Sequence, residues 1–274
     1  MRVLKFGGSS LASAQRFIDV ANIIEQQCQS TNVAVVVSAP QGVTNHLVAM
    51  AENINDEVKM KADLAHFKTA IENIIADLSA SIPQFDANHA EQALVNWEHQ
   101  LTRYMQGAHL LSYCPDHVRA MVISIGERLS VAMLTSIMSS KSIDNQAIEP
   151  EKFLRTNEVY LNSVADLVLC KELFNRHYET LAKVSVMPGF IGVNSQEEVT
   201  TLGRNGSDYS AAVLAVCAQA ECCEIWTDVD GVYNADPRVI KDAQLLDYLS
   251  YQEAMELSYF GAKVLHPKTI GPIA

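Results

Sequence analysis

The 274-residue sequence predicts an α/β protein built on a parallel sheet, and two segments near its start carry that prediction. A short apolar run at 3–6 ends in two glycines and two serines, and apolar residues at helical spacing follow at 11–24. The same order recurs with an apolar run at 33–37, a turn, and an apolar helix face at 43–51. Two consecutive strand–helix units favour a parallel sheet, because each helix returns the chain to the edge where its strand began.

The middle of the chain predicts a helical insertion followed by a return to the sheet. Residues 57–113 lack strand signals and place apolar side chains at helical spacing on both sides of Pro83, so we expect a helical hairpin that breaks there. We then expect a strand at 118–125, a helix that begins at Gly126-Glu127 and runs through Ser140, and a weaker strand at 143–148.

The last third of the chain repeats the order of strand, glycine-containing turn and helix. The elements that we expect here are strands at 184–193, 199–202 and 224–227, helices at 209–218 and around 252–259, and a loop rich in Asp, Gly and Pro at 228–238.

Composition excludes several classes of protein. Apolar residues make up 49% of the chain and charged residues 19%, which excludes collagen, low-complexity disorder and a small disulfide scaffold. The net charge of −12 has the wrong sign for broad contact with nucleic-acid phosphates or anionic lipid, so we expect neither nucleic acid nor a membrane as a partner. The six cysteines contain no CxxC pair, and no segment resembles a signal peptide or approaches 18 consecutive apolar residues. We therefore expect a cytoplasmic protein without disulfides or a zinc site.

Three loops combine charged or polar side chains with exposed backbone N–H groups. In the first, Lys5 leaves a strand beside Gly7 and Gly8, an arrangement that suits an anion, although a structural turn also explains the glycines. In the second, at 203–208, Arg204 suits a carboxylate, whereas an ordinary helix cap explains only one of the polar residues. The third, at 227–238, follows a buried strand at the edge where open α/β sheets bind ligands, and an Asp-Gly surface turn is its alternative.

Two single charges also stand out. Glu127 begins a helix after a predicted strand and could complement the helix dipole or bind an ammonium group. Lys263 lies in an apolar stretch, for which a lysine that extends its ammonium group to solvent is the commoner explanation. The eight histidines show no HxH or HExxH spacing, so the sequence supports neither a metalloprotease nor another metal centre.

Six segments in order along the chain resemble the motif set of the aspartate kinases in the amino acid kinase family: KFGGSS, VVVSAP, SIGE, GRNGSDYSAA, EIWTDVDGVYNADPR and SYQEAMELSYFGAKVLHP. The resemblance covers nearly the whole chain and is strongest to the kinase part of the threonine-sensitive bifunctional aspartokinase/homoserine dehydrogenases. Ser9 departs from the pattern, because the family more often has Thr there. The resemblance implies an αβα sandwich around a mainly parallel sheet, and MgATP-dependent phosphorylation of the side-chain carboxylate of L-aspartate to 4-phospho-L-aspartate, the first step toward lysine, threonine, methionine and isoleucine.

The resemblance also implies a role for each matching residue. Lys5 and Lys263 would lie near the transferred phosphoryl group, and Asp208 would hold the geometry of the active-site lysine. Contacts to aspartate would come from Ser38, Thr44, Glu127, Phe190, Arg204 and Ser207. Contacts to ATP would come from Lys5, Gly7, Gly8, Thr227, Asp228, Tyr233, Arg238 and Lys263, with Mg²⁺ brought by the nucleotide and no metal ligands assigned to the protein.

This chemistry suits the residues, because a carboxylate is already ionised at pH 7 and needs no general base to attack phosphorus. Two alternatives stay open: a kinase of the same family that acts on glutamate or carbamate, and a non-catalytic module that binds a nucleotide or an amino acid. We expect residues 1–274 to form one amino acid kinase catalytic domain, truncated at its C-terminus and without the ACT regulatory and homoserine dehydrogenase domains of longer relatives. A homo-oligomer stays an open expectation.

Overall fold

The computed structural model describes residues 1–235, 239–259 and 266–274, and its centre is a five-stranded sheet in which every neighbouring pair is parallel. In spatial order the strands are β3 (Asn145–Ala147), β4 (Val184–Pro188), β2 (Val33–Val37), β1 (Arg2–Phe6) and β7 (Cys222–Trp226). Strands of this sheet that follow one another in the chain connect through segments that contain helices, as a parallel sheet requires. The α/β fold predicted from the sequence is confirmed.

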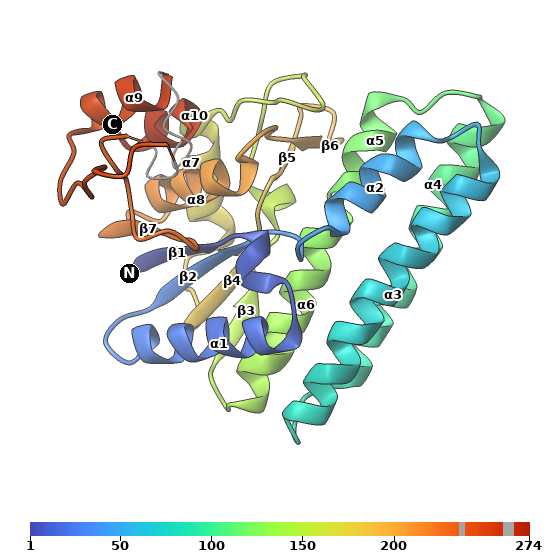
Figure 1. Cartoon of the computed structure of the whole chain (residues 1–274), viewed down its shortest axis with the longest axis horizontal. Coiled ribbons are helices and arrows are strands. Elements are labelled where there is room, and N and C mark those ends of the chain that lie inside the picture. Colours follow the sequence, from blue (N-terminus) through green and yellow to red (C-terminus); the bar gives the residue numbers. More distant parts are fainter. Residues whose placement is uncertain (236–238, 260–265) are drawn as a thin grey trace.

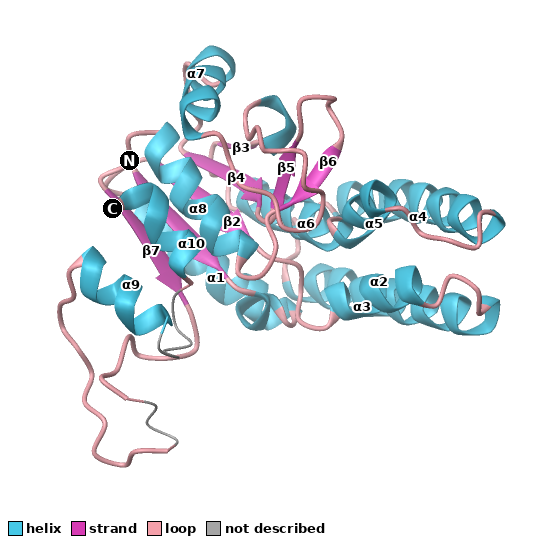
Figure 2. Ribbon diagram, turned by 90° about the horizontal axis from the view of Figure 1, so that it is seen from above, coloured by secondary structure: helices cyan, strands magenta, loops and turns pink. Residues whose placement is uncertain are grey.

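Helices cover both faces of the sheet, which makes an αβα sandwich (Figures 1 and 2). Because successive strand residues point to opposite faces, Leu4 packs in one core with the helices α1 (Ala14–Cys28) and α6 (Ile125–Ser140). Val3 packs in a second core with α7 (Leu167–His177) and α8 (Gly206–Cys217). The helix α7 has no counterpart among the elements expected from the sequence.

The expected helical hairpin is present and is built from two long helices, α3 (Glu57–Ser81) and α4 (Ala87–Leu110). Each begins at an aspartate cap, with Asp56 accepting from the Lys59 N–H and Asp86 from the His89 N–H, both at 3.1 Å. The hairpin projects from the sheet together with the shorter helices α2 (Val43–Glu52) and α5 (Asp116–Ile123) (Figure 1).

The strand predicted at 118–125 is wrong, because this segment forms α5 and the start of α6. Pro115 and Asp116 supply a helix start, and tertiary packing then overrides the β-branched composition. The run Asp116–Ser140 is long and apolar enough to cross a membrane, and among the described residues it is the one helical run that is so. However, 83% of its most apolar window is buried inside the protein, as in a core helix.

The strand expected at 184–193 divides into β4 and a short strand β5 (Ile191–Val193), which pairs antiparallel with β6 (Val199–Thr201) in a separate two-stranded sheet. The division falls at Gly189 and Phe190, where Phe190 adopts a positive φ of 72°. A left-handed backbone cannot continue a strand, so the chain turns out of the main sheet here. The weaker strand expected at 143–148 is present as β3.

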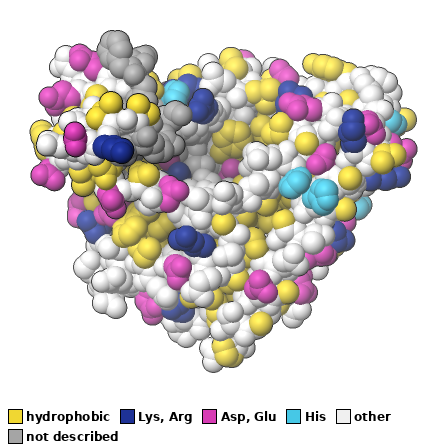
Figure 3. Space-filling view, viewed as in Figure 1, with side chains coloured by type: hydrophobic (Ala, Val, Ile, Leu, Met, Phe, Trp, Pro, Cys, Tyr) yellow, Lys and Arg dark blue, Asp and Glu magenta, His cyan; other side chains and the backbone are white. Residues whose placement is uncertain are grey.

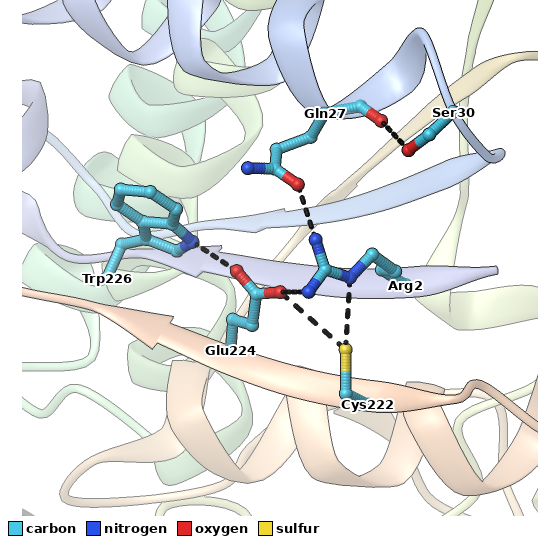
Figure 4. A network of polar contacts seen from close by, with 6 residues as sticks. All are labelled: Arg2, Gln27, Ser30, Cys222, Glu224 and Trp226. Atoms are coloured by element: carbon cyan, nitrogen blue, oxygen red, sulfur yellow. Dashed lines mark hydrogen bonds and ion pairs between the residues drawn. The ribbon is translucent and has the colours of Figure 1, made fainter.

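Near the C-terminus, α10 (Pro267–Ile270) packs against α8 and against α9 (Tyr251–Tyr259). In the described chain, short 3₁₀ helices occupy Gly8–Leu11, Pro150–Lys152 and Gly271–Ile273. A polar network joins the edge strand β7 to β1 (Figure 4). Glu224 accepts from the Trp226 indole at 3.0 Å and forms an ion pair with Arg2 at 2.8 Å. The six cysteines, all within the described residues, are free thiols.

Candidate active site

The register of the sheet aligns four predicted or neighbouring loops at one edge. Phe6 pairs with both Val37 and Trp226, and Val37 pairs with Pro188. The next residue of each strand therefore begins a loop at the same level of the carboxyl edge, where open α/β sheets bind ligands. Those residues are Gly7, Ser38, Gly189 and Thr227.

Lys5 and Asp208 form an ion pair beneath this edge. The Lys5 Nζ lies 2.6 Å from Asp208 Oδ1, and the two side chains are only 12% and 8% exposed. Lys5 comes from β1, while Asp208 lies in the first turn of α8, so the pair joins a strand end to a helix N-terminus. Asn205 donates to the other Asp208 oxygen at 3.3 Å, and this fixes the carboxylate in place. The structure thus brings together two of the three predicted catalytic residues.

The glycine loop after β1 lies close against the loop after β2. A Cβ on Gly8 would meet the Ala39 carbonyl oxygen at 2.8 Å, and Gln41 donates its N–H to the Gly8 carbonyl at 3.1 Å. A Cβ on Gly7 would lie 3.3 Å from the Lys5 Nζ. Gly7 therefore keeps backbone next to the lysine ammonium group, and Gly8 lets the two loops approach, as a phosphate-binding loop requires.

Glu127 is a buried carboxyl group in the first turn of α6. Burial raises its pKa to about 8, and hydrogen bonds from its own backbone and from that of Ala39 oppose the rise only in part. Glu127 Oε2 is buried without a hydrogen-bond partner among the described residues. A desolvated carboxyl group with an unused acceptor oxygen is suited to bind a cation such as an ammonium group. The helix-dipole alternative leaves that oxygen unexplained.

The loops at 189–190 and 203–208 interlock over the N-terminus of α8. A Cβ on Gly189 would meet the Ser207 side chain at 2.7 Å, and one on Gly206 would meet Phe190 Cδ2 at 2.6 Å. The Phe190 N–H donates to Ser210 Oγ at 2.8 Å, which holds the left-handed backbone of Phe190. The predicted residues Phe190 and Ser207 therefore lie where the two loops meet, Ser207 against Gly189 and Phe190 against Gly206, with Ser207 buried.

The other predicted contacts to aspartate are more accessible. Ser38 begins the loop after β2 and is half-buried, and Thr44, also half-buried, lies in the first turn of α2. Arg204 is exposed in the loop that precedes Asn205 and α8. A cation at this position and the acidic Glu127 offer opposite charges to the two ends of an amino acid.

The residues predicted to contact ATP are only partly gathered. Thr227 and Asp228 are exposed beyond β7, where Thr227 Oγ1 lies 3.1 Å from Asp228 Oδ1, and the Tyr233 hydroxyl donates to Asp230 at 3.4 Å. Thr227 lines a cavity of about 790 Å³ along the open edge of β7, whereas Lys5, Gly7 and Gly8 are absent from its described lining. Arg238 and Lys263 lie outside the described residues.

Three supporting residues were not singled out from the sequence. Asn205, with a left-handed φ of 56°, positions Asp208, and Ser210 holds Phe190. Ala39 packs beneath Gly126, whose Cβ would lie 2.5 Å from that of Ala39. Asn205 stands within the GRNGSD segment, so its position could have been noticed, whereas the other two act through contacts that no local pattern reports.

Comparison with known proteins identifies the family of this chain. The model of the amino acid kinase family matches residues 1–274. The chain belongs to the amino acid kinase family. It is 46% identical to a bifunctional aspartokinase/homoserine dehydrogenase of Buchnera aphidicola, covering all of this chain and 34% of the relative, and 44% identical to that of Haemophilus influenzae with the same coverage. The chain thus spans about a third of the length of these relatives.

A solved relative supports the same placement within the amino acid kinase family. Escherichia coli aspartokinase III, in its R-state complex with aspartate and ADP, superposes with a TM-score of 0.88 at 31% identity, over 99% of this chain and 59% of that one. The T-state of that enzyme with lysine and aspartate superposes with a TM-score of 0.86 at 32% identity, with the same coverage. Both likenesses extend over the sheet and the helical hairpin of this chain.

Proposed function

We propose that this domain is an aspartate kinase, which transfers the γ-phosphoryl group of ATP to the side-chain carboxylate of L-aspartate. The observation that carries the proposal is the buried oxygen of Glu127, which has no hydrogen-bond partner in the described part of the chain and which a substrate ammonium group would satisfy. The likeness of the whole chain to aspartokinases supports aspartate as the substrate over other amino acids. The Lys5–Asp208 pair then supplies the cation that phosphoryl transfer requires at the same edge.

In this proposal, opposite charges orient the substrate. Glu127 binds the ammonium group of aspartate in its ionised form, and Arg204 binds the α-carboxylate through its guanidinium group. With the ammonium group and the α-carboxylate held, the side-chain carboxylate is directed toward the glycine loop and Lys5. This places the attacking oxygen near the phosphoryl group before the reaction begins.

The chemical step needs no proton transfer. A carboxylate oxygen of aspartate forms a bond to the γ-phosphorus, the bond from that phosphorus to the β,γ-bridging oxygen breaks, and the electron pair leaves with ADP. Lys5 balances negative charge on the transferred group, and Asp208 holds the ammonium of Lys5 at a fixed place. The backbone N–H groups that follow Gly7 and Gly8 are available to the phosphates.

Mg²⁺ would accompany ATP rather than occupy a site built by the protein. Asp208, the buried carboxylate paired with Lys5, is already engaged by Lys5 and Asn205. The exposed Asp228 beyond β7 keeps a second carboxylate oxygen that could accept from waters of a hydrated ion, and Mg²⁺ commonly keeps several waters while it binds phosphate oxygens. The ion would neutralise phosphate charge; the positioning is done by the side chains described above.

Trapping of the acyl phosphate with hydroxylamine tests the proposal and separates its alternatives. We expect ATP-dependent hydroxamate with L-aspartate and little with L-glutamate or without an amino acid. Equal product with glutamate would favour a different acid kinase of the family. Binding of ATP and aspartate without any hydroxamate would favour a non-catalytic module.

A further inference from the structure

We propose that His46, Asp63 and His66 form a binding site for a divalent transition-metal ion between α2 and α3. One ligand atom from each of these side chains lies within 4.8 Å of the other two. His46 belongs to α2, and the other two residues belong to α3, so the cluster joins two helices. Histidine side chains gather on the face over these helices (Figure 3).

The geometry is close to that of a metal centre. His46 Nδ1 lies 3.2 Å from Asp63 Oδ1, and the rings of His46 and His66 are 5.3 Å apart between centroids. With metal–ligand bonds of about 2.0–2.2 Å, neighbouring ligand atoms lie roughly 3.0–3.5 Å apart. The His46–Asp63 pair already has this spacing. Asp63 and His66 are three residues apart on one helix face, and rotation of the exposed His66 ring completes the set.

The donor set selects the class of ion. Two imidazoles and one carboxylate suit Zn²⁺, Co²⁺, Ni²⁺ or Cu²⁺, whereas Mg²⁺ and Ca²⁺ prefer oxygen ligands. Nearby lysines of α3 are engaged by their own carboxylates, Lys59 with Asp56 at 3.1 Å and Lys61 with Glu57 at 2.6 Å. The Asp63 carboxylate is directed at the His46 imidazole, 3.2 Å away, and a ligand nitrogen of His66 lies within 4.8 Å of it. The exposed side of His66 gives an ion access and leaves room for water ligands.

A helix–helix hydrogen bond from His46 to Asp63 is the simpler explanation of that one contact, but it leaves the approach of His66 unexplained. An ion held by both helices would fasten α2 to α3. Thr44, a predicted contact to aspartate, lies two residues before His46 in the first turn of α2, so the two sites are neighbours that use different side chains. This inference does not rest on the proposed kinase function, and its readouts need no activity.

Titration of the tag-free chain with Co²⁺ tests the site, in the absence of ATP and aspartate, which bind metals themselves. We expect one Co²⁺ per chain, visible ligand-field absorption without a thiolate-to-cobalt band, and displacement by Zn²⁺. Asp63→Asn preserves the shape of the side chain, and His66→Ala removes an exposed ring. Each should weaken binding by about tenfold or more. His99→Ala, an exposed histidine on α4, should bind as wild type does.

Thermal unfolding gives an independent measurement. Zn²⁺ should raise the Tm of the wild-type chain and of His99→Ala, because an ion that binds the native state stabilises it. The same addition should raise the Tm of Asp63→Asn much less, because the weakened site is less occupied at the same Zn²⁺ concentration. Absence of binding to the wild-type chain, equal affinity in Asp63→Asn and His66→Ala, or a thiolate band that points to the cysteines would each overturn the proposal.

Discussion

Burial opposes ionisation of the Glu127 carboxyl group. Its pKa is raised to about 8 by burial, so the native protein binds a proton there that the unfolded chain releases near pH 4.5. Between those two pH values the native state holds more protons than the unfolded state. The contribution of Glu127 to stability is therefore fully present below pH 4.5 and is lost as the pH rises through about 8.

Glu127→Gln removes this conflict. Without substrates, we expect the variant to gain stability over wild type as the pH rises from 4.5 to 8, by up to a few kcal/mol, because a neutral amide carries no ionisation cost. Urea unfolding across this pH range measures the difference, with Glu91→Gln, an exposed glutamate on α4, as the matched control. Parallel stability curves for Glu127→Gln and wild type would contradict the assignment of the raised pKa.

The Lys5–Asp208 pair predicts strongly coupled effects on stability. Lys5→Met or Asp208→Asn alone leaves an unpaired group in a buried place, and we expect each to lower the free energy of unfolding by roughly 3–5 kcal/mol. The double variant should lose much less than the sum, since neither charge is then left alone. A double-mutant cycle by urea unfolding measures the coupling, and additive losses would show that the ion pair is energetically unimportant.

Among the elements, the contact of α6 with the loop after β2 sets the position of Glu127. Gly126→Ala would place a Cβ 2.5 Å from that of Ala39 and 3.0 Å from Val43 Cγ1, so helix and loop must separate. We expect a loss of roughly 1–3 kcal/mol in stability and weaker aspartate binding, with ATP affinity nearly kept. Urea unfolding and calorimetric titration with each ligand measure these effects.

Gly107→Ala on α4 is the matched control, because no described atom outside the local backbone of its own helix lies within 4 Å of the added Cβ. There the same substitution should stabilise the protein by about 0.5–1 kcal/mol, since alanine is the better helix former. If both variants behaved alike, the close contact between Gly126 and Ala39 would have no energetic meaning.

The elements could be predicted where local pattern and tertiary packing agree. The strands predicted at 3–6 and 33–37 are short apolar runs that each end at a glycine-containing turn. Their predicted bounds differ from those of β1 and β2 by at most one residue. The prediction of a strand at 118–125 was wrong because the valines and isoleucines of this segment favour a strand. Pro115 and burial against neighbouring helices instead favour a helix. The break at Phe190 also escaped prediction, because the positive φ of this non-glycine residue depends on a hydrogen bond that its N–H donates to Ser210 Oγ, 20 residues further along the chain.

At the scale of the whole molecule, the site depends on contacts between distant segments. Sequence patterns identified the loops around Lys5 and Asp208, and the family resemblance suggested that they meet, but their 2.6 Å approach follows only from the strand order and the packing of α8. The His46–Asp63–His66 cluster was missed because its members come from two helices and have no ligand spacing in the sequence. The spacing of apolar residues along the sequence predicts helices and strands, whereas a site also depends on the order and register in which those elements pack.

Transfer of the labelled γ-phosphoryl group from ATP to aspartate in a single turnover, at saturating substrates, tests the central claim most directly. We expect rapid transfer by the wild-type chain and by Lys152→Ala. Lys152 is an exposed lysine in the 3₁₀ helix Pro150–Lys152, outside the loops predicted to bind substrates. Lys5→Ala should be slower by about a hundredfold, or ~3 kcal/mol, with ATP still bound. Lys5→Arg, which keeps the charge, should fall between them. Transfer by folded Lys5→Ala at the wild-type rate would contradict the account.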